Sequence, residues 1–548
     1  MMKMKGIDFC DTPELSATAL SPRAPVVTGP GLCTVLAGTS ADLDLRKVSD
    51  RVAEPCATRM GREAVYSLLA APISDRARLG ARQDSLAALA SACRRRDVLQ
   101  ALAVMKACER DAFEPLYRQE DPDRDAALSM LYFTGPRFRG FNRNGTSEAL
   151  ALYNGYVRPL ASLLQPAMYV IVPWVVLRLK YKVKMTLMAF VKMTFVVIMA
   201  VNKALPSWRR RAMTVLYAAS TAHVAVSNIN ASATLRQVVR VAQTRGRAVS
   251  AWRAARATLE SVPGVAAATV AFFGEVPARE VPAHRGAVGA YWTSLSDRDA
   301  LAAEHRAGGV LDALMAVAAA RRRLVMVAPR FMDESEDGPA LVGLGAHHPL
   351  LRRTGPGQAF CVGPDKRVMV TGPNAAGKST YMRNVMLVAI MAQTIGSVPC
   401  RECLIKPFGL FATAFRVSDA TGGSSLFQAQ LGRMTAIAMA TEETPGLVAV
   451  DEPFGSTTVE EGKAAFRAAI GRVGGDSSVI WSTHNFKDLV DGAAPIRLDA
   501  LVHRRGIKFP YRPRSGVSHQ NIALLLICLN KAVDAHVRQT ALQSLRCR

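Results

Sequence analysis

Apolar and polar positions repeat with two different periods along this chain of 548 residues. From about residue 41 to residue 157, apolar residues recur three and four positions apart, which is typical of amphipathic helices. Within this stretch, residues 57–90 predict two helices broken at Pro72, because proline disfavours a helical conformation in the residue before it. The Ser74-Asp75 pair is well placed to cap the second helix.

The helical period returns from Ser207 to about residue 320, and the pattern changes after Leu324. Short apolar runs then alternate with helical stretches; the runs are Val368–Val370, Leu447–Val450 and Val479–Ser482. Such alternation is typical of a parallel sheet flanked by helices. The pattern therefore predicts a mainly helical region followed by an α/β domain.

Residues 159–202 fit neither pattern. Two apolar runs, each approaching the length needed to cross a bilayer, are joined by the basic segment RLKYKVK. Three prolines interrupt the first run and Lys192 lies inside the second. A basic linker between apolar runs is compatible with a membrane hairpin or an interfacial anchor, and also with a buried helical pair.

The chain carries 69 Lys and Arg against 44 Asp and Glu, a formal net charge of +25. This excess favours a polyanionic partner, either nucleic acid or an anionic membrane surface. The ten cysteines are scattered, and Cys400 and Cys403 lack a second ligand pair at zinc spacing. We therefore expect no zinc and no disulfide framework, and an intracellular reducing compartment, nucleus or cytoplasm. The polar N-terminus is unlike a secretory signal.

A phosphate-binding loop follows the apolar run that ends at Val370. The eight residues from Gly372 to Ser379 fit G-x-x-x-x-G-K-[ST] between a strand and a helix. Their N–H groups and the helix N-terminus should hold phosphates, with Lys378 at the β and γ phosphates and the Ser379 hydroxyl on Mg²⁺. The predicted ATP-binding residues are Gly372, Pro373, Asn374, Ala375, Ala376, Gly377, Lys378, Ser379 and Thr380.

Acidic and imidazole groups follow the next two predicted strands. Asp451 ends one buried run and can hold Mg²⁺, and Glu452 can position or deprotonate the attacking water. His484 follows the third run, where it could sense the γ-phosphate. Glu452, Lys378 and His484 are thus the predicted catalytic residues, with Ser379 and Asp451 as the magnesium ligands.

These motifs together resemble those of the MutS family of mismatch-repair ATPases. The segment TGPNAAGKSTYMRN is similar to the family's phosphate loop and helix, DEPFGSTTVEEG to its acidic motif, and STHNFKDL to its T-H-x-x-x-L motif. The segment TRMGREAVYSLLAAPISDRARLGARQ resembles helices of the family's core domain, and YRPRSGVSHQNIAL resembles the segment after the ATPase. The likeness covers roughly residues 45–100 and 335–530.

The resemblance implies a dimer with two composite ATP sites. It makes Ser425 the residue that reaches the partner's nucleotide, with Ser424 as the neighbouring alternative and Gln430 where the family has Glu. About 45 residues precede the core, too few for the family's mismatch-recognition domain. An F-x-E tripeptide like that domain's wedge begins at Phe273, in the later helical region, so we do not expect it to read mismatches.

The sequence thus predicts an α plus α/β fold: a mainly helical core and lever region, then a P-loop NTPase domain of ABC-like type with a mixed, largely parallel sheet and a helical C-terminal tail. The expected function is ATP binding and hydrolysis coupled to binding of DNA, mismatched or branched, in repair or recombination. The alternatives are a membrane-associated MutS-like ATPase anchored by residues 159–202, an SMC or ABC ATPase, and a nucleotide-binding structural protein. The expected segments are a leader (1–40), helical core (41–158), apolar insert (159–205), core and lever (206–325), ATPase (326–500) and C-terminal dimerisation tail (501–548).

Overall fold

The computed structural model describes residues 25–117, 122–133, 137–143, 146–153, 157, 165–274, 286–333, 335–353, 357–363, 367–415, 426–455, 457–484, 492–503, 506–520, 522, 525, 527–528 and 534–546. The chain divides into two compact units. One contains Ala107–Ala254 and Arg279–Ala303, and the other contains Arg23–Lys106, Ala255–Ala278 and Glu304–Arg548.

The first unit is helical. Its core is aromatic: the rings of Phe113 and Trp252 lie 4.6 Å apart, and those of Tyr132 and Trp292 lie 5.0 Å apart. The Tyr132 hydroxyl donates to the Val288 carbonyl at 2.8 Å, so this buried ring has a partner for its polar end. The elements are η1 (Glu109–Phe113), α6 (Glu114–Tyr117), α7 (Pro122–Leu131), η2 (Arg139–Arg143), α8 (Thr146–Leu152), α10 (Gln165–Leu179), α11 (Leu187–Ala204), α14 (Gly286–Ser296) and most of α12 (Ser207–Glu260).

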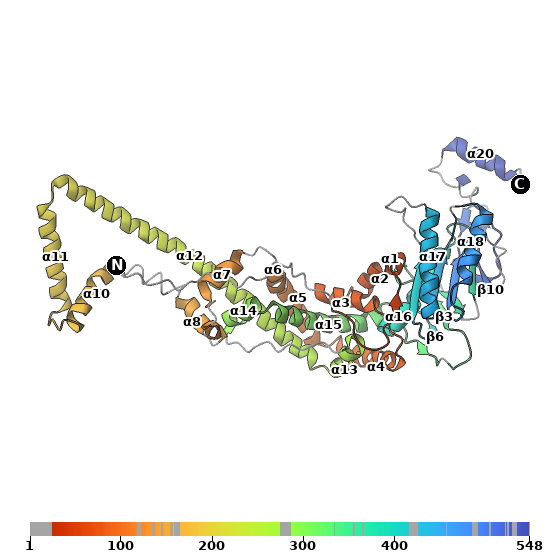
Figure 1. Cartoon of the computed structure of the whole chain (residues 1–548), viewed down its shortest axis with the longest axis horizontal. Coiled ribbons are helices and arrows are strands. Elements are labelled where there is room, and N and C mark those ends of the chain that lie inside the picture. The colour runs from red at the N-terminus through yellow and green to blue at the C-terminus, as the bar shows by residue number, and fades with distance from the viewer. Residues whose placement is uncertain are drawn as a thin grey trace. The chain divides into compact units, whose positions relative to one another are not determined.

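The apolar insert forms two helices, α10 and α11, of which α10 packs on α11 and α11 leads into the long helix α12 (Figure 1). Many of its apolar side chains are exposed, so the expectation of a buried pair is wrong for these residues. Among the helices that the structure describes, none combines the length and the apolar character needed to cross a membrane.

Two helices of the second unit, α3 and α4, are separated where the sequence indicates. The break at Pro72 separates α3 (Arg59–Leu69) from α4 (Arg76–Ala92), and the Asp75 carboxylate accepts a hydrogen bond from the Arg78 N–H at 3.1 Å, capping α4. Both predictions are confirmed. The remaining helices before the sheet are α1 (Thr39–Asp42), α2 (Leu45–Val52), α5 (Arg96–Cys108), α13 (Val265–Phe273) and α15 (Arg298–Arg323), the last of which begins in the first unit.

The second unit contains a seven-stranded sheet of order β1-β7-β8-β9-β5-β10-β13. Its strand pairs are parallel except that of β10 with β13, which confirms the predicted largely parallel sheet. The strands are β1 (Thr34–Val35), β5 (Arg367–Thr371), β7 (Leu410–Ala414), β8 (Gly446–Asp451), β9 (Ser478–Ser482), β10 (Ala493–Leu498) and β13 (Pro513–Ser515). Strand β1 lies in the expected leader and β13 lies beyond residue 500, so the sheet extends past both of those expected boundaries.

Helices cover both faces of this sheet. On one face, α17 (Leu426–Glu443) and α18 (Val459–Gly471) contribute Met434 and Phe466 to a cluster with Val448 and Trp481. On the other face lies α16 (Lys378–Ile395), which also contacts α3 and α4 and is buried on nearly every side. A helix that is apolar all round is stable only when enclosed in this way.

A second, four-stranded sheet of order β2-β6-β3-β4 lies against α16, and a short ladder pairs β11 with β12. The strands are β2 (Arg330–Phe331), β3 (Leu341–Ala346), β4 (Gln358–Val362), β6 (Glu402–Ile405), β11 (Leu501–His503) and β12 (Gly506–Lys508); the last helix is α20 (Ala535–Arg546). A helical tail was predicted, and α20 confirms it.

Candidate ATP site

The loop between β5 and α16 has backbone conformations that favour glycine. Gly377 has φ of 91° and Gly372 has φ of 154°. A Cβ at Gly372 would lie 2.3 Å from the Leu498 carbonyl oxygen, which leaves no room for any side chain. The glycines of the motif are therefore required by the path of the backbone, which directs the loop around the start of α16.

Lys378 extends back over this loop and is almost fully buried, with 5% of its side chain exposed. Its ammonium donates to the carbonyl oxygens of Gly372 at 3.2 Å and Pro373 at 3.5 Å. The same nitrogen lies 3.4 Å from Glu452 Oε1 and 2.6 Å from His484 Nε2. The structure thus brings together the three side chains that the sequence predicted to be catalytic.

The acidic pair is positioned by the register of two parallel strands. Asp451 at the end of β8 is paired with Ser482 at the end of β9. The Ser482 hydroxyl donates to Asp451 Oδ1 and accepts the backbone N–H of Glu452 at 3.1 Å. One hydroxyl therefore holds both the carboxylate of Asp451 and the backbone of Glu452, which has the left-handed φ of 49°.

Glu452 is half-buried and its carboxylate makes two contacts with basic groups. His484 Nε2 lies 3.0 Å from Oε1, and Lys378 is the second partner. The hydrogen bond to His484 is the largest cause that lowers the pKa of Glu452 from its ordinary value of 4.5, followed by the charges of His484 and Lys378. Since both partners favour the charged form, this carboxylate is ionised at neutral pH.

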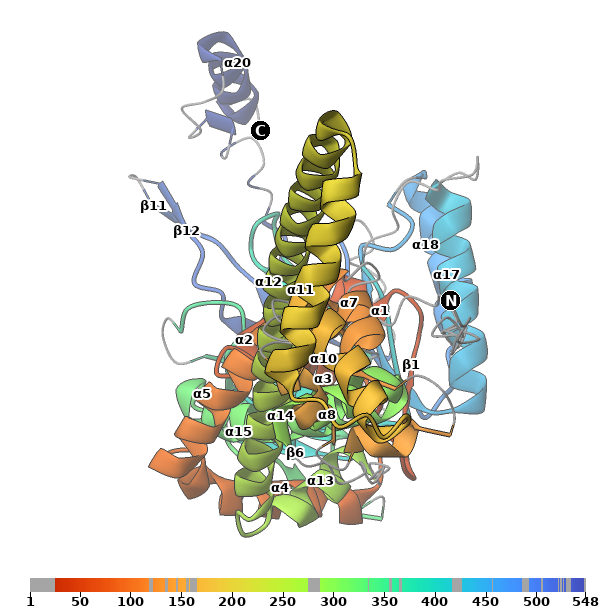
Figure 2. The ribbon, with the colours of Figure 1, turned by 90° about the vertical axis from the view of Figure 1, so that its left-hand side faces the viewer.

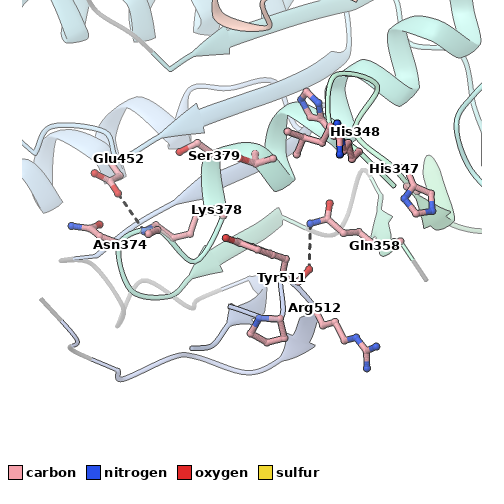
Figure 3. A pocket seen from close by; sticks show the side chains of 17 residues that line it. His347, His348, Gln358, Asn374, Lys378, Ser379, Glu452, Tyr511 and Arg512 are labelled. Carbon is pink, nitrogen blue, oxygen red and sulfur yellow. Dashed lines mark hydrogen bonds and ion pairs between the residues drawn. The ribbon is translucent and has the colours of Figure 1, made fainter. Parts of the chain in front are cut away.

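A cavity of about 680 Å³ opens beside the loop. Figure 3 shows the side chains of Lys378, Ser379 and Glu452 on one side of it and those of Tyr511 and Gln358 on another. The Gln358 amide donates to the Tyr511 carbonyl at 3.4 Å, joining β4 to the segment after β12. The lining residues are Ala346, His347, His348, Leu351, Arg352, Gly357, Gln358, Asn374, Ala375, Gly377, Lys378, Ser379, Thr380, Glu452, Pro510, Tyr511 and Arg512.

The shape and chemistry of this cavity suit a nucleoside triphosphate. Phosphate groups fit beside the loop and Lys378, while Arg512 supplies a second cation and the Tyr511 ring an aromatic face. Gly377 lies so close to Tyr511 that an added Cβ would meet the ring at 2.9 Å. The ring is therefore held directly against the start of α16.

Several of the predicted site residues line the cavity, and others lie beside it. Asn374, Ala375, Gly377, Lys378, Ser379, Thr380 and Glu452 line it. Gly372 and Pro373 contact Lys378 through their carbonyls. Ala376 is buried behind the loop, with its N–H donating to the Pro373 carbonyl. Ser425, the predicted trans-acting residue, and its alternative Ser424 lie outside the described residues.

Sequence reasoning missed two components of the site. Ser482 is a polar residue at the carboxyl end of a strand next to β8, and this position is the signal that could have identified it. Tyr511 lies far along the chain from the phosphate loop and reaches it only through the fold. Phe273, the start of the F-x-E tripeptide, ends α13 with a buried ring, as expected for a residue that packs in a core.

The donor set near the loop fits Mg²⁺. The Ser379 hydroxyl faces the cavity, and the Asp451 carboxylate lies at the end of β8, which β9 separates from β5, with one oxygen bound by Ser482. Mg²⁺ prefers hard oxygen ligands of these kinds and retains several waters, so few protein ligands are needed. These two residues would hold the ion beside the phosphates.

The strand–loop–helix unit, the acidic pair at the end of β8 and the mainly parallel sheet are the features of a P-loop ATPase domain within the second unit. Residues 368–542 match the family model described as MutS domain V. The resemblance seen in the motifs is thereby confirmed over this segment, which carries a domain of the MutS type.

Proposed function

We propose that the chain binds ATP with Mg²⁺ in the cavity at the phosphate loop and hydrolyses it. The observation that carries the proposal is the meeting of Lys378, Glu452 and His484 within 3.4 Å of one another beside that loop. MutS domain V belongs to a family of ATPases, which supports the same activity.

The roles follow from where each group lies. The ammonium of Lys378 and the loop N–H groups bind the β and γ phosphates, replacing the carbonyl contacts that Lys378 makes. Glu452 is ionised and half-exposed, so it can accept a proton from a water attacking the γ phosphate. His484 orients Glu452 through the 3.0 Å contact. Bound Mg²⁺ would neutralise charge developing on the phosphates.

The test is a comparison of Glu452→Gln with the wild type. The change keeps the shape of the side chain and removes the base, so kcat for phosphate release should fall by roughly 10²-fold or more. Binding of a fluorescent ATP analogue should be retained, because the loop and Lys378 are unchanged. Glu460→Gln on the exposed part of α18 is the matched control and should hydrolyse ATP at the wild-type rate. Equal rates for wild type and Glu452→Gln would reject the catalytic assignment and favour a nucleotide-binding structural role.

We further propose that ATP turnover is coupled to DNA binding by a dimer, as in the MutS family, inside a reducing compartment. The net charge of +25 and the family match support DNA as the partner. The scattered spacing of the ten cysteines in the sequence is the reason for proposing this compartment. The trans role of Ser425 and a dimerisation role for the C-terminal tail belong to this proposal.

The DNA proposal is tested by titrating homoduplex, mismatched and branched DNA with and without ATP at two salt concentrations. We expect binding to all three at low salt and a change in affinity on adding ATP. Selective binding of the mismatched duplex would show that the chain discriminates mismatches, contrary to the expectation from its sequence. Absence of binding to any DNA at low salt would reject the proposal.

A further inference from the structure

Among the residues that the structure describes, the helices α10 and α11 and the start of α12 carry many apolar side chains that are exposed. On α11, Met188 is 66% exposed, Val196 64% and Val197 55%, although these residues point in different directions around the helix. Phe190 is the buried exception. A helix that is apolar on all sides is stable in water only when another surface covers it.

All the charged residues in this part of the chain are basic. Between Glu148 and Glu260 the sequence contains eleven Arg and five Lys and not one Asp or Glu. Most of the basic residues near α11 lie at its two ends: Lys180, Lys182 and Lys184 precede it, and Lys203 in its last turn is followed by the Arg209–Arg211 run, while Lys192 lies within the helix. A partner must therefore accept apolar side chains and supply negative charge at both ends of α11.

Aromatic rings lie at those same ends. Trp174 is contacted by the Arg178 guanidinium at 5.4 Å, Tyr181 by Lys180 at 5.8 Å and Trp208 by Arg209 at 5.1 Å. Trp208 is 65% exposed and Tyr181 62%. Exposed Trp and Tyr beside Lys and Arg, flanking an apolar stretch, suit the boundary between lipid headgroups and acyl chains.

From these three observations we propose that α10, α11 and the first turns of α12 form a docking surface for an anionic phospholipid membrane (Figure 2). The side chains of α11 enter the headgroup and upper acyl region, and the cations at its two ends contact the anionic headgroups. This inference does not depend on the ATPase proposal, since the surface lies in the first unit and the ATP cavity in the second.

Two other occupants fit the surface less well. DNA would satisfy the cations but would leave the exposed Val and Phe side chains of α11 in water. A second copy of this surface would cover the apolar side chains but would bring two clusters of Lys and Arg together without any carboxylate between them. An anionic lipid surface satisfies both requirements.

The experiment is flotation of the full chain with vesicles of phosphatidylcholine alone or with phosphatidylserine added. We expect binding to the anionic vesicles that is at least tenfold stronger than to the neutral ones, because each Lys or Arg near the surface adds to the attraction. Phe195→Asp combined with Ile198→Asp should abolish this binding, since both residues are exposed on α11. Val270→Asp, an exposed apolar position on α13, is the control and should bind as the wild type does.

A second pair of variants tests the charge. Lys182→Glu with Lys184→Glu should lower binding to anionic vesicles by roughly tenfold or more, while Arg94→Glu with Arg96→Glu, exposed residues of the second unit, should not. Circular dichroism and denaturant unfolding of each variant serve as the check that the chain is folded.

Three results would overturn the proposal. One is failure of the wild type to bind anionic vesicles. Another is loss of DNA binding in Phe195→Asp/Ile198→Asp with vesicle binding unchanged, which would assign the surface to nucleic acid. The third is a change from dimer to monomer in light scattering on the same substitutions with vesicle binding unchanged, which would assign it to a second copy.

Discussion

Among single residues, Ser482 has a small side chain that positions two neighbouring groups of the site at once. Its hydroxyl binds both the Asp451 carboxylate and the Glu452 N–H, so one oxygen fixes the proposed metal ligand and the proposed catalytic base relative to each other. Residues that orient metal ligands commonly change metal affinity or activity by about 10- to 100-fold when they are removed.

Ser482→Ala should therefore raise the Mg²⁺ concentration needed for half-maximal ATP hydrolysis by roughly tenfold. Ser478→Ala is the matched control: it lies on the same strand, and its buried hydroxyl has no hydrogen-bond partner among the residues that the structure describes. The measurement is phosphate release as a function of Mg²⁺ at saturating ATP. An unchanged Mg²⁺ dependence in Ser482→Ala would show that Asp451 does not depend on this contact.

The contact between His484 and Glu452 sets a pH dependence. The folded-state pKa of Glu452 is below 4.5, so the protonated form becomes significant only as pH falls through that lowered value. Hydrolysis should therefore show no acidic loss from Glu452 between about pH 8 and pH 5.5. His484→Asn removes the main cause of the shift, so the acidic limb of the pH–rate profile should move to higher pH.

The control for the pH profile is His503→Asn, an exposed histidine of β11. Its profile should overlie that of the wild type. If the acidic limb of His484→Asn also overlay the wild-type limb, the residue would not act through the carboxylate of Glu452.

At the scale of elements, α16 links the ATP site to the helices around it. Arg82 on α4 is fully buried, and its guanidinium donates to the carbonyls of Ala271 at 2.9 Å, Phe272 at 3.0 Å and Gln393 at 3.3 Å. It also donates to the Thr394 carbonyl. Burial lowers the pKa of Arg82 to about 9, so the group remains charged at neutral pH. One side chain thus joins α4, the end of α13 and the end of α16.

Arg82→Met should destabilise the chain by about 2–4 kcal/mol, because several buried carbonyls lose a charged donor while most of the packing volume is kept. Arg94→Met, at an exposed position just after α4, should change stability by less than about 0.5 kcal/mol. Denaturant unfolding followed by circular dichroism measures both. A loss in Arg82→Met no greater than that in the control would show that these carbonyls find other partners.

The elements also show what the sequence could predict. The strand–loop–helix unit around Lys378 and the run ending at Asp451 were predictable, because a phosphate loop and a buried parallel strand each have a local pattern. The pairing of β1 with β7 was not predictable, because a two-residue strand has almost no sequence pattern of its own. Its partner strand also lies about 375 residues away along the chain. Tyr511 was missed because it lies far along the chain from the phosphate loop and reaches it only through the fold.

The exposure of α11 was also unpredictable from sequence. An apolar run of that length is equally compatible with a buried helix and with a membrane-associated helix. Only the arrangement of the neighbouring helices determines how much of its surface is covered. The sequence predicted only that His484 and Glu452 lie at the same edge of the sheet. Their direct contact was not predicted, because the distance between two side chains depends on the loops that follow the strands.

At the scale of the whole molecule, the net charge of +25 makes binding to any polyanion sensitive to salt. Each cation that neutralises a DNA phosphate adds about 0.9 to the slope of log K against log salt concentration. The long helix α12 presents exposed arginines, among them Arg240 and Arg247, in the stretch without carboxylates. If this helix contacts DNA, its arginines contribute to the slope irrespective of DNA sequence.

Arg240→Gln combined with Arg247→Gln should therefore weaken binding to homoduplex and mismatched DNA equally and reduce the salt slope by about two. Arg94→Gln with Arg96→Gln removes the same charge from the second unit and should leave the slope nearly unchanged. Fluorescence anisotropy over a series of salt concentrations gives both values. An equal loss of slope in the two double variants would mean that DNA senses only the total charge, whereas a loss confined to Arg240 and Arg247 would place the DNA phosphates along α12.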